Sequence, residues 1–227
     1  IYWVDGNGAN ANRLTQYNMP KLVSKSLTWE RIRTTDIGLD LGFLNNELTV
    51  GFDWYQRENR DMLAPAQVLP NSVGATAPYD NAGTLRTRGW ELNLDWHHKF
   101  GEFNVYANFN LSDSKTKVTK WNNDTKLLSS YYSGKNYGDI WGFETDRYFE
   151  ESDFTGQNAD GSWNYKPGIA GQSALERAPF HYGPGDIKFK DLDGSGAIDG
   201  GKGTADDHGD LKVIGNSLPR YEYGFHL

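Results

Sequence analysis

Apolar residues recur at every second position within 89–98 and again within 103–112. Side chains on a β-strand point alternately to its two faces, so each stretch predicts a strand with one apolar and one polar face. The short gap at 99–102 predicts that the two strands form an antiparallel hairpin. The apolar residues of the first strand are Trp90, Leu92, Leu94 and Trp96.

A second pair of alternating stretches lies earlier in the chain, at 36–44 and 47–56. Asn45 and Asn46 separate them, and asparagine tolerates the positive φ of a tight turn. We therefore predict a second long hairpin. The alternation starts again at about position 218 and continues to the last residue, which predicts the beginning of a fifth strand.

The predicted strands are roughly ten residues long, about what a tilted strand needs to cross a bilayer. Tight turns join them at one end, whereas long segments, 57–88 and 113–217, join them at the other. Outer-membrane barrels have short periplasmic turns and long extracellular loops. We predict an all-β fold, a fragment of an antiparallel transmembrane β-barrel. A half-buried soluble β-sandwich shares the alternation and is the alternative.

The domain organisation follows from these elements. Residues 1–26 are rich in Asn and Gly without a sustained period, so we expect a loop segment there. Residues 27–227 are expected to form part of the barrel, with 57–88 and 113–217 as extracellular loops. The chain begins without Met and ends inside an alternating run, which suggests a piece of a longer protein.

Composition narrows the class of protein. Hydrophobic residues make up 37% of the 227 residues and form no long run, so we expect no transmembrane helix. The formal net charge of -7 argues against nucleic acid as a partner. The absence of Cys excludes disulfides, thiolate metal sites and cysteine nucleophiles within this chain.

An acidic segment beginning at Asp191, with the sequence DLDGSGAID, has the pattern that opens a calcium-binding loop. Oxygen ligands occupy positions one, three and five, and a glycine at position six allows the sharp turn. Lys202 stands at position twelve, where a bidentate Glu belongs, so a later carboxylate must close the loop. The alternative is an acidic turn without metal. The predicted ligands of a structural Ca²⁺ are Asp191, Asp193, Ser195, the carbonyl of Ala197, Asp199 and Asp210.

The other candidate residues are aromatic. Trp141, Tyr148 and Trp163 lie in the segment 113–217 and are candidates for ligand or partner contacts, with packing in a small core as the alternative. The five His lack zinc-like spacing, and no Gly-x-Ser-x-Gly, phosphate-loop or His-Glu-x-x-His motif occurs. We therefore expect no enzymatic activity.

Five blocks of the chain resemble one family of transporters. Segments 27–63 and 81–118 resemble the barrel region of SusC/RagA-like TonB-dependent transporters of Bacteroidetes. Segments 138–149 (GDIWGFETDRYF) and 184–199 (PGDIKFKDLDGSGAID) look like an external loop of that family. Segment 213–227 (VIGNSLPRYEYGFHL) follows in the family's order.

The resemblance implies a bacterial outer-membrane protein, a single-chain barrel of about twenty-two strands with a plugged lumen, surrounded by membrane lipid. It implies uptake of glycans, or of peptides, energised through TonB, with a SusD-like surface lipoprotein over the external loops. The plug and the TonB-contacting segment are N-terminal in that family and lie outside this chain. The stretch 200–209 departs from the family's pattern, which leaves open how the calcium loop closes.

Two rival functions remain open at this point. One is a soluble, calcium-stabilised carbohydrate-binding β-sandwich. The other, more distant, is a secreted glycan hydrolase. The faces of the hairpins distinguish them, because a sandwich buries its apolar residues between two sheets.

Overall fold

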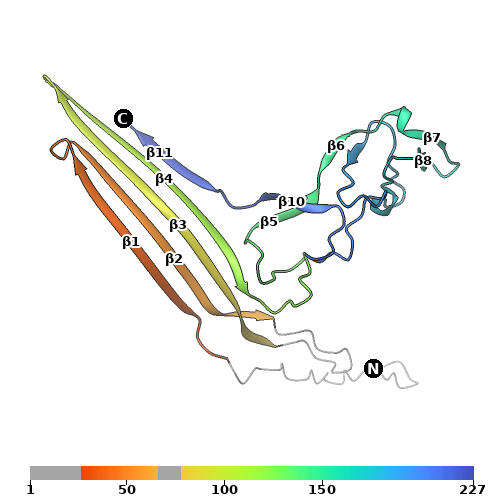
Figure 1. Cartoon of the computed structure of the whole chain (residues 1–227), viewed down its shortest axis with the longest axis horizontal. Coiled ribbons are helices and arrows are strands. Elements are labelled where there is room, and N and C mark those ends of the chain that lie inside the picture. The colour runs from red at the N-terminus through yellow and green to blue at the C-terminus, as the bar shows by residue number, and fades with distance from the viewer. Residues whose placement is uncertain (1–26, 66–77) are drawn as a thin grey trace, which may run out of the picture.

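The computed structural model describes residues 27–65 and 78–227 (Figure 1). The predicted loop segment 1–26 lies outside the described residues. Antiparallel strands dominate the described part, which confirms the predicted all-β class. None of its helices is long and apolar enough to cross a membrane.

One five-stranded antiparallel sheet carries both predicted hairpins and forms the left half of Figure 1. The strand order is β1-β2-β3-β4-β11, and the sheet is open. β11 confirms the predicted fifth strand. The strands are β1 (Arg31–Phe43), β2 (Leu48–Pro65), β3 (Tyr79–Phe100), β4 (Phe103–Lys120) and β11 (Tyr221–His226).

Tight turns join the hairpins at one end of the sheet, as the sequence predicted. Leu44, Asn45 and Asn46 all have positive φ, and the two Asn tolerate this conformation better than other side chains. The second turn consists of Gly101, at φ 60°, and Glu102. It is shorter than the predicted gap because Lys99 and Phe100 still pair with β4.

The predicted loop 57–88 was wrong for most of its length, because β2 runs to Pro65 and β3 begins at Tyr79. The register shifts between Asn59 and Met62, which interrupts the alternation from which strands were predicted. Polar residues also occupy both faces of this part of the sheet. Backbone pairing continues there without an apolar face to mark it.

The predicted loop 113–217 starts inside β4, and the connection that follows β4 has secondary structure of its own. Residues 121–216, here called the long connection, contain three two-stranded sheets. Their strands are too short for a period to show in the sequence. The pairs are β5 (Asp139–Phe143) with β10 (Leu211–Asn216), β6 (Thr145–Tyr148) with β9 (Ile187–Phe189), and β7 (Phe154–Gln157) with β8 (Trp163–Tyr165).

An aromatic cluster forms the core of the long connection. Phe149 and Phe154 are 2% and 4% exposed, and their ring centroids lie 5.1 Å apart. Tyr165 and Trp163 pack against Phe154 at 5.2 Å each. This cluster explains how a segment with short strands holds a defined shape.

Candidate membrane-facing wall and cation-binding loop

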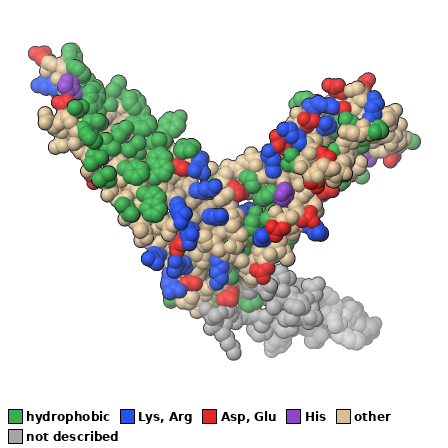
Figure 2. All heavy atoms as spheres, viewed as in Figure 1, with side chains coloured by type: hydrophobic (Ala, Val, Ile, Leu, Met, Phe, Trp, Pro, Cys, Tyr) green, Lys and Arg blue, Asp and Glu red, His purple; other side chains and the backbone are tan. Residues whose placement is uncertain are grey.

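One face of the five-stranded sheet is apolar across all five strands. The register places one row of residues at Leu39, Phe52, Leu92, Leu111 and Tyr223. The next row is Leu41, Val50, Leu94, Phe109 and Phe225. No second sheet covers these rows within residues 27–65 and 78–227, and Leu39 and Phe225 are 56% and 64% exposed. Figure 2 shows this face as a continuous apolar surface.

Aromatic side chains mark both ends of the apolar face. Phe52 and Trp90 stack at 6.4 Å, and Trp96 meets Phe100 edge-on at 6.3 Å. Such aromatic belts flank the hydrocarbon-facing band of transmembrane barrels. The belt towards the long connection contains Trp54, Trp90 and Tyr221, and the belt beside the tight turns contains Trp96, Phe100 and Phe103.

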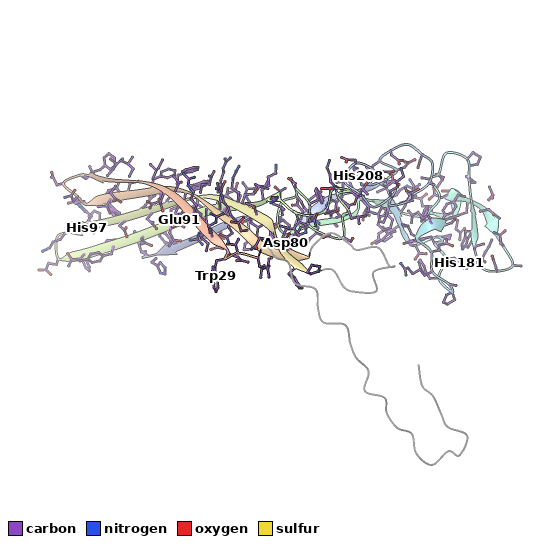
Figure 3. The ribbon with its side chains drawn as sticks, turned by 90° about the horizontal axis from the view of Figure 1, so that it is seen from below. Trp29, Asp80, Glu91, His97, His181 and His208 are labelled. Atoms are coloured by element: carbon purple, nitrogen blue, oxygen red, sulfur yellow. The ribbon has the colours of Figure 1, made fainter. Side chains whose placement is uncertain are left out.

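The opposite face of the same strands is polar. One row consists of Asp40, Gly51, Asn93, Asn110 and Gly224. Asn108 donates a hydrogen bond to Asp95 across the β3–β4 pair at 2.7 Å. Glu91, labelled in Figure 3, belongs to this face. A wall with one apolar and one polar face suits a barrel with lipid outside and water inside.

The continuation of the apolar face contains a buried ion cluster that was not predicted from the sequence. Glu58 is 5% exposed and accepts hydrogen bonds from Nε of Arg86 at 2.6 Å and Nε of Arg60 at 2.9 Å. Position parity could have found it, because 58 and 86 continue the even positions of Trp54 and Trp90.

The long connection brings together three of the six predicted calcium ligands. One carboxylate oxygen each of Asp191, Asp193 and Asp210 lie within 4.8 Å of one another. Oxygens bound to one Ca²⁺ at 2.3–2.6 Å lie at such separations, so these three fit a shared ion. It is the only group of three or more Asp, Glu or His side chains this close in the described part of the chain.

Asp210 is fully buried and organises this loop from the C-terminal side. Its carboxylate accepts the N–H groups of Leu192 at 2.6 Å and of Asp199 at 3.0 Å. Asp191 accepts the N–H groups of Gly194 at 2.7 Å and of Gly196 at 2.9 Å. The N–H of Ser195 donates to Asp193 in the same way, so backbone hydrogen bonds hold all three carboxylates in place.

The remaining predicted ligands, Ser195, Ala197 and Asp199, make local hydrogen bonds of their own. Ser195 Oγ donates to the carbonyl of Ala197 at 2.9 Å, so these two oxygens contact each other. The carboxylate of Asp199 accepts the N–H of Gly201 at 2.7 Å and lies outside the three-carboxylate group. Three carboxylates are fewer than the six to eight oxygens that Ca²⁺ takes, so these groups or water would complete the shell.

In the described part of the chain, no ion pair neutralises the three carboxylates of the acidic loop. Across the described ranges, no Lys, Arg or His nitrogen lies within 4.0 Å of the carboxylates of Asp191, Asp193 or Asp210. The N–H of Ser195 donates to Asp193 at 2.9 Å, which lowers the pKa of that carboxyl below its usual value. Like charges held close together favour a bound cation.

The predicted aromatic contact residues lie in three different small sheets. Trp141 is in β5, with its ring 5.4 Å from that of His208, and Trp163 in β8 packs on Phe154. Tyr148, at the end of β6, is 67% exposed. Tyr148 is thus the most accessible of the three, and the structure assigns them no common surface.

Comparison with known proteins identifies the family. Residues 4–200 match the family described as TonB dependent receptor-like, beta-barrel. The chain belongs to this family. The match includes β1 to β4 and most of the long connection, which confirms the predicted barrel class and the predicted resemblance. Members of this family are receptors and transporters rather than enzymes.

Two relatives give the extent of the similarity to other TonB-dependent receptors. TonB-dependent receptor P3 of Formosa agariphila is 27% identical over 215 residues, covering 88% of this chain and 19% of that protein. TonB-dependent receptor SusC of Bacteroides thetaiotaomicron is 33% identical over 76 residues, covering 34% of this chain and 8% of that protein. The chain spans about a fifth of the length of the first of these relatives.

Solved structures of a RagAB peptide importer align with the same share of this TonB-dependent receptor chain. In the open-open state the TM-score is 0.49 at 22% identity, covering 62% of this chain and 16% of that one. In the closed-closed state the TM-score is 0.46 at 23% identity, covering 62% and 17%.

Proposed function

We propose that the intact protein is a nutrient importer of the bacterial outer membrane that draws energy from TonB. The two-faced sheet carries this proposal. One face has apolar rows that cross the sheet, such as the row from Leu41 in β1 to Phe225 in β11, and the other face has polar rows, such as the row from Asp40 to Gly224. Membership of the TonB-dependent receptor-like barrel family supports it independently.

The orientation in the membrane follows from the connections. The tight turns at Asn45 and Gly101 would face the periplasm, and the long connection would face the cell exterior. The end of β2 at Pro65 and the start of β3 at Tyr79 would lie on the exterior side as well. A folded external segment of this size offers a docking surface for a SusD-like lipoprotein, and Tyr148 is its proposed aromatic contact.

The proposed cargo is a glycan or a peptide. The lumen-facing rows offer amide and carboxylate groups at Asn93, Asp95, Asn108 and Asn110. These groups donate to and accept from hydroxyl and peptide groups alike. They favour a polar, uncharged or cationic cargo over an anionic one.

Uptake by living cells tests this function. Deleting the gene for the intact protein should abolish uptake of one class within a panel of glycans and peptides, and the wild-type gene should restore it. An affinity-tagged protein should bring down a surface lipoprotein from the outer-membrane fraction. Unchanged uptake across the panel, with the protein in the soluble fraction, would contradict the proposal.

We also propose that the loop 191–210 binds a structural Ca²⁺ through Asp191, Asp193 and Asp210. The convergence of their oxygens within 4.8 Å supports this. The ion would fix the return of the long connection to β10 and β11.

Melting of the full-length protein tests the calcium proposal. Removing Ca²⁺ with a chelator should lower Tm, and Asp193→Asn should abolish the response. At 100 times Kd, bound Ca²⁺ stabilises by about 2.7 kcal/mol. Asp124→Asn, an exposed carboxylate of the same connection, is the matched control and should leave the response intact. The same Tm with and without chelator would refute calcium binding.

A further inference from the structure

The outward face of the sheet changes from apolar to basic immediately beyond Trp54 and Trp90. The next row contains Gln56, Arg88 and Lys115, and the row after it contains Glu58, Arg86 and Lys117. Five cations line one shallow hollow there together with Trp54 and Trp90. This basic belt consists of Arg86, Arg88, Lys115, Lys117 and Arg220. Figure 2 shows it as a basic cluster between the apolar surface and the long connection.

The basic belt carries a surplus of positive charge. Glu58 pairs with Arg86, and Asp113 accepts a hydrogen bond from Nη2 of Arg220 at 2.9 Å. Arg88, Lys115 and Lys117 have no carboxylate within 4.0 Å among the residues that the structure describes.

The partners present hold the guanidinium groups in place. Arg88 donates from Nε to Gln56 at 2.8 Å, and Arg86 is fixed by Glu58. Planar guanidinium groups fixed in this way match the geometry of phosphate oxygens, and neighbouring lysines add point charges.

The height of the basic belt matches the edge of a membrane. Phe100 and Trp90 lie in the two aromatic belts, and ten residues of strand rise roughly 33 Å at about 3.3 Å each. At a tilt of about 40°, this spans about 25 Å, the height of the apolar band of a barrel. Arg88 therefore lies just outside the hydrocarbon, at the end that carries the long connection.

We propose that the basic belt binds the phosphate groups of lipids in the outer leaflet of the membrane. The proposal rests on the membrane location proposed above. A lipid is favoured over a soluble anion because the belt is continuous with rows that face acyl chains. Lipid tails would pack on Trp90 and Leu92 while the head-group phosphate meets Arg88, Lys115 and Lys117.

Lipid binding by the full-length protein in a neutral detergent tests this inference. Phosphatidylglycerol is the anionic probe, phosphatidylcholine the zwitterionic comparison and inorganic phosphate the competitor, with bound lipid counted by native mass spectrometry. The test variant combines R88Q, K115Q and K117Q. The control combines R57Q, K99Q and K166Q, which remove the same charge from exposed positions on the polar face and in the long connection.

The wild type should prefer phosphatidylglycerol, and the test variant should bind it about tenfold more weakly, since each exposed ion pair contributes modestly. The control should stay within about twofold of the wild type. Equal binding of both lipids, equal loss in the control, or full displacement by inorganic phosphate would overturn the inference. So would loss of a co-purifying protein in the test variant with lipid binding unchanged, which would mark the belt as a protein-docking surface.

Heat-modifiable migration in detergent gels separates failure of this inference from failure of the proposed function. A wild-type protein that never forms a detergent-resistant barrel would contradict the membrane location, and the inference with it. A wild type and test variant that both form the barrel and bind phosphatidylglycerol equally would contradict the inference alone.

Discussion

Asp153 shows how one side chain can hold the long connection together. It is 4% exposed, and its carboxylate accepts two hydrogen bonds from the guanidinium of Arg147, at 2.7 and 2.6 Å. The N–H of Glu150 adds a third bond at 2.9 Å. The Arg147 hydrogen bonds, ahead of the backbone bond, lower the pKa of Asp153 to about 2.

This lowered pKa predicts that acid weakens the long connection. Because the folded-state pKa is below the unfolded value, the stabilisation is present above about pH 4 and is lost as pH falls towards about 2. Hydrogen exchange of peptides around Phe149 and Phe154 in the full-length protein, corrected for intrinsic rates, should accelerate between pH 6 and pH 2.5. Equal protection at both pH values would contradict the assignment.

Replacing the carboxylate should remove the same pH dependence. Asp153→Asn loses the charged partner of Arg147 and should cost about 1–3 kcal/mol of local stability at pH 6. Asp160→Asn, an exposed carboxylate in the same connection, is the matched control and should retain the wild-type response at Asp153.

The calcium-loop residues show what spacing can and cannot predict. The sequence spacing predicted that Asp191 and Asp193 lie close together, and Asp210 was the predicted closing carboxylate. The structure places these three carboxylates in one group. Asp199 could not be placed from spacing, because its direction depends on the N–H of Gly201, a local turn contact. The bond between Ser195 and Ala197 is of the same kind.

At the scale of elements, the sequence predicted which strands exist better than where they end. Both hairpins and β11 follow from the alternation, since each strand has one apolar face. The end of β2 and the start of β3 lie beyond the apolar face, where Glu58, Arg60 and Arg86 replace apolar residues. A bulge after Asn59 also changes which positions of β2 point to each face. The short strands of the long connection gain their stability from aromatic contacts distant in sequence, such as Phe143 with Phe189 and Phe149 with Tyr165. Periodicity does not encode such contacts.

A close fit between β2 and β3 gives a prediction for the packing of the two hairpins against each other. Gly89 is buried, and a Cβ there would lie 2.6 Å from the ring of Tyr55 and 2.9 Å from the carbonyl of Asp113. Gly89→Ala should therefore destabilise the full-length protein by about 1–3 kcal/mol, measured as a lower urea midpoint.

Gly51→Ala is the matched control on the same face, because its nearest neighbour would be a carboxylate oxygen of Asp40 at 3.3 Å. That variant should match the wild type or slightly exceed its stability. If both variants unfold at the same urea concentration, the prediction that β2 and β3 pack too closely at Gly89 for a Cβ is contradicted.

At the scale of the whole molecule, the open sheet leaves five strands of apolar surface uncovered in the described part of the chain. A soluble sandwich would cover this surface with a second sheet. The alternation predicted which face is apolar. It did not predict the basic belt, because charged residues replace the apolar ones beyond Trp54 and Trp90 and the alternation ends there.

The central claim is that Leu92 and Leu94 face lipid while Asn93 and Asp95 face water. The chain contains no Cys, so single cysteines at these four positions of the full-length protein can carry a spin label in the membrane. Collisions with oxygen, which concentrates in lipid, should be frequent at 92 and 94, and collisions with a water-soluble nickel complex should be frequent at 93 and 95. Labels at 92 and 94 that are shielded from both reagents would place these residues inside a protein core and contradict the account.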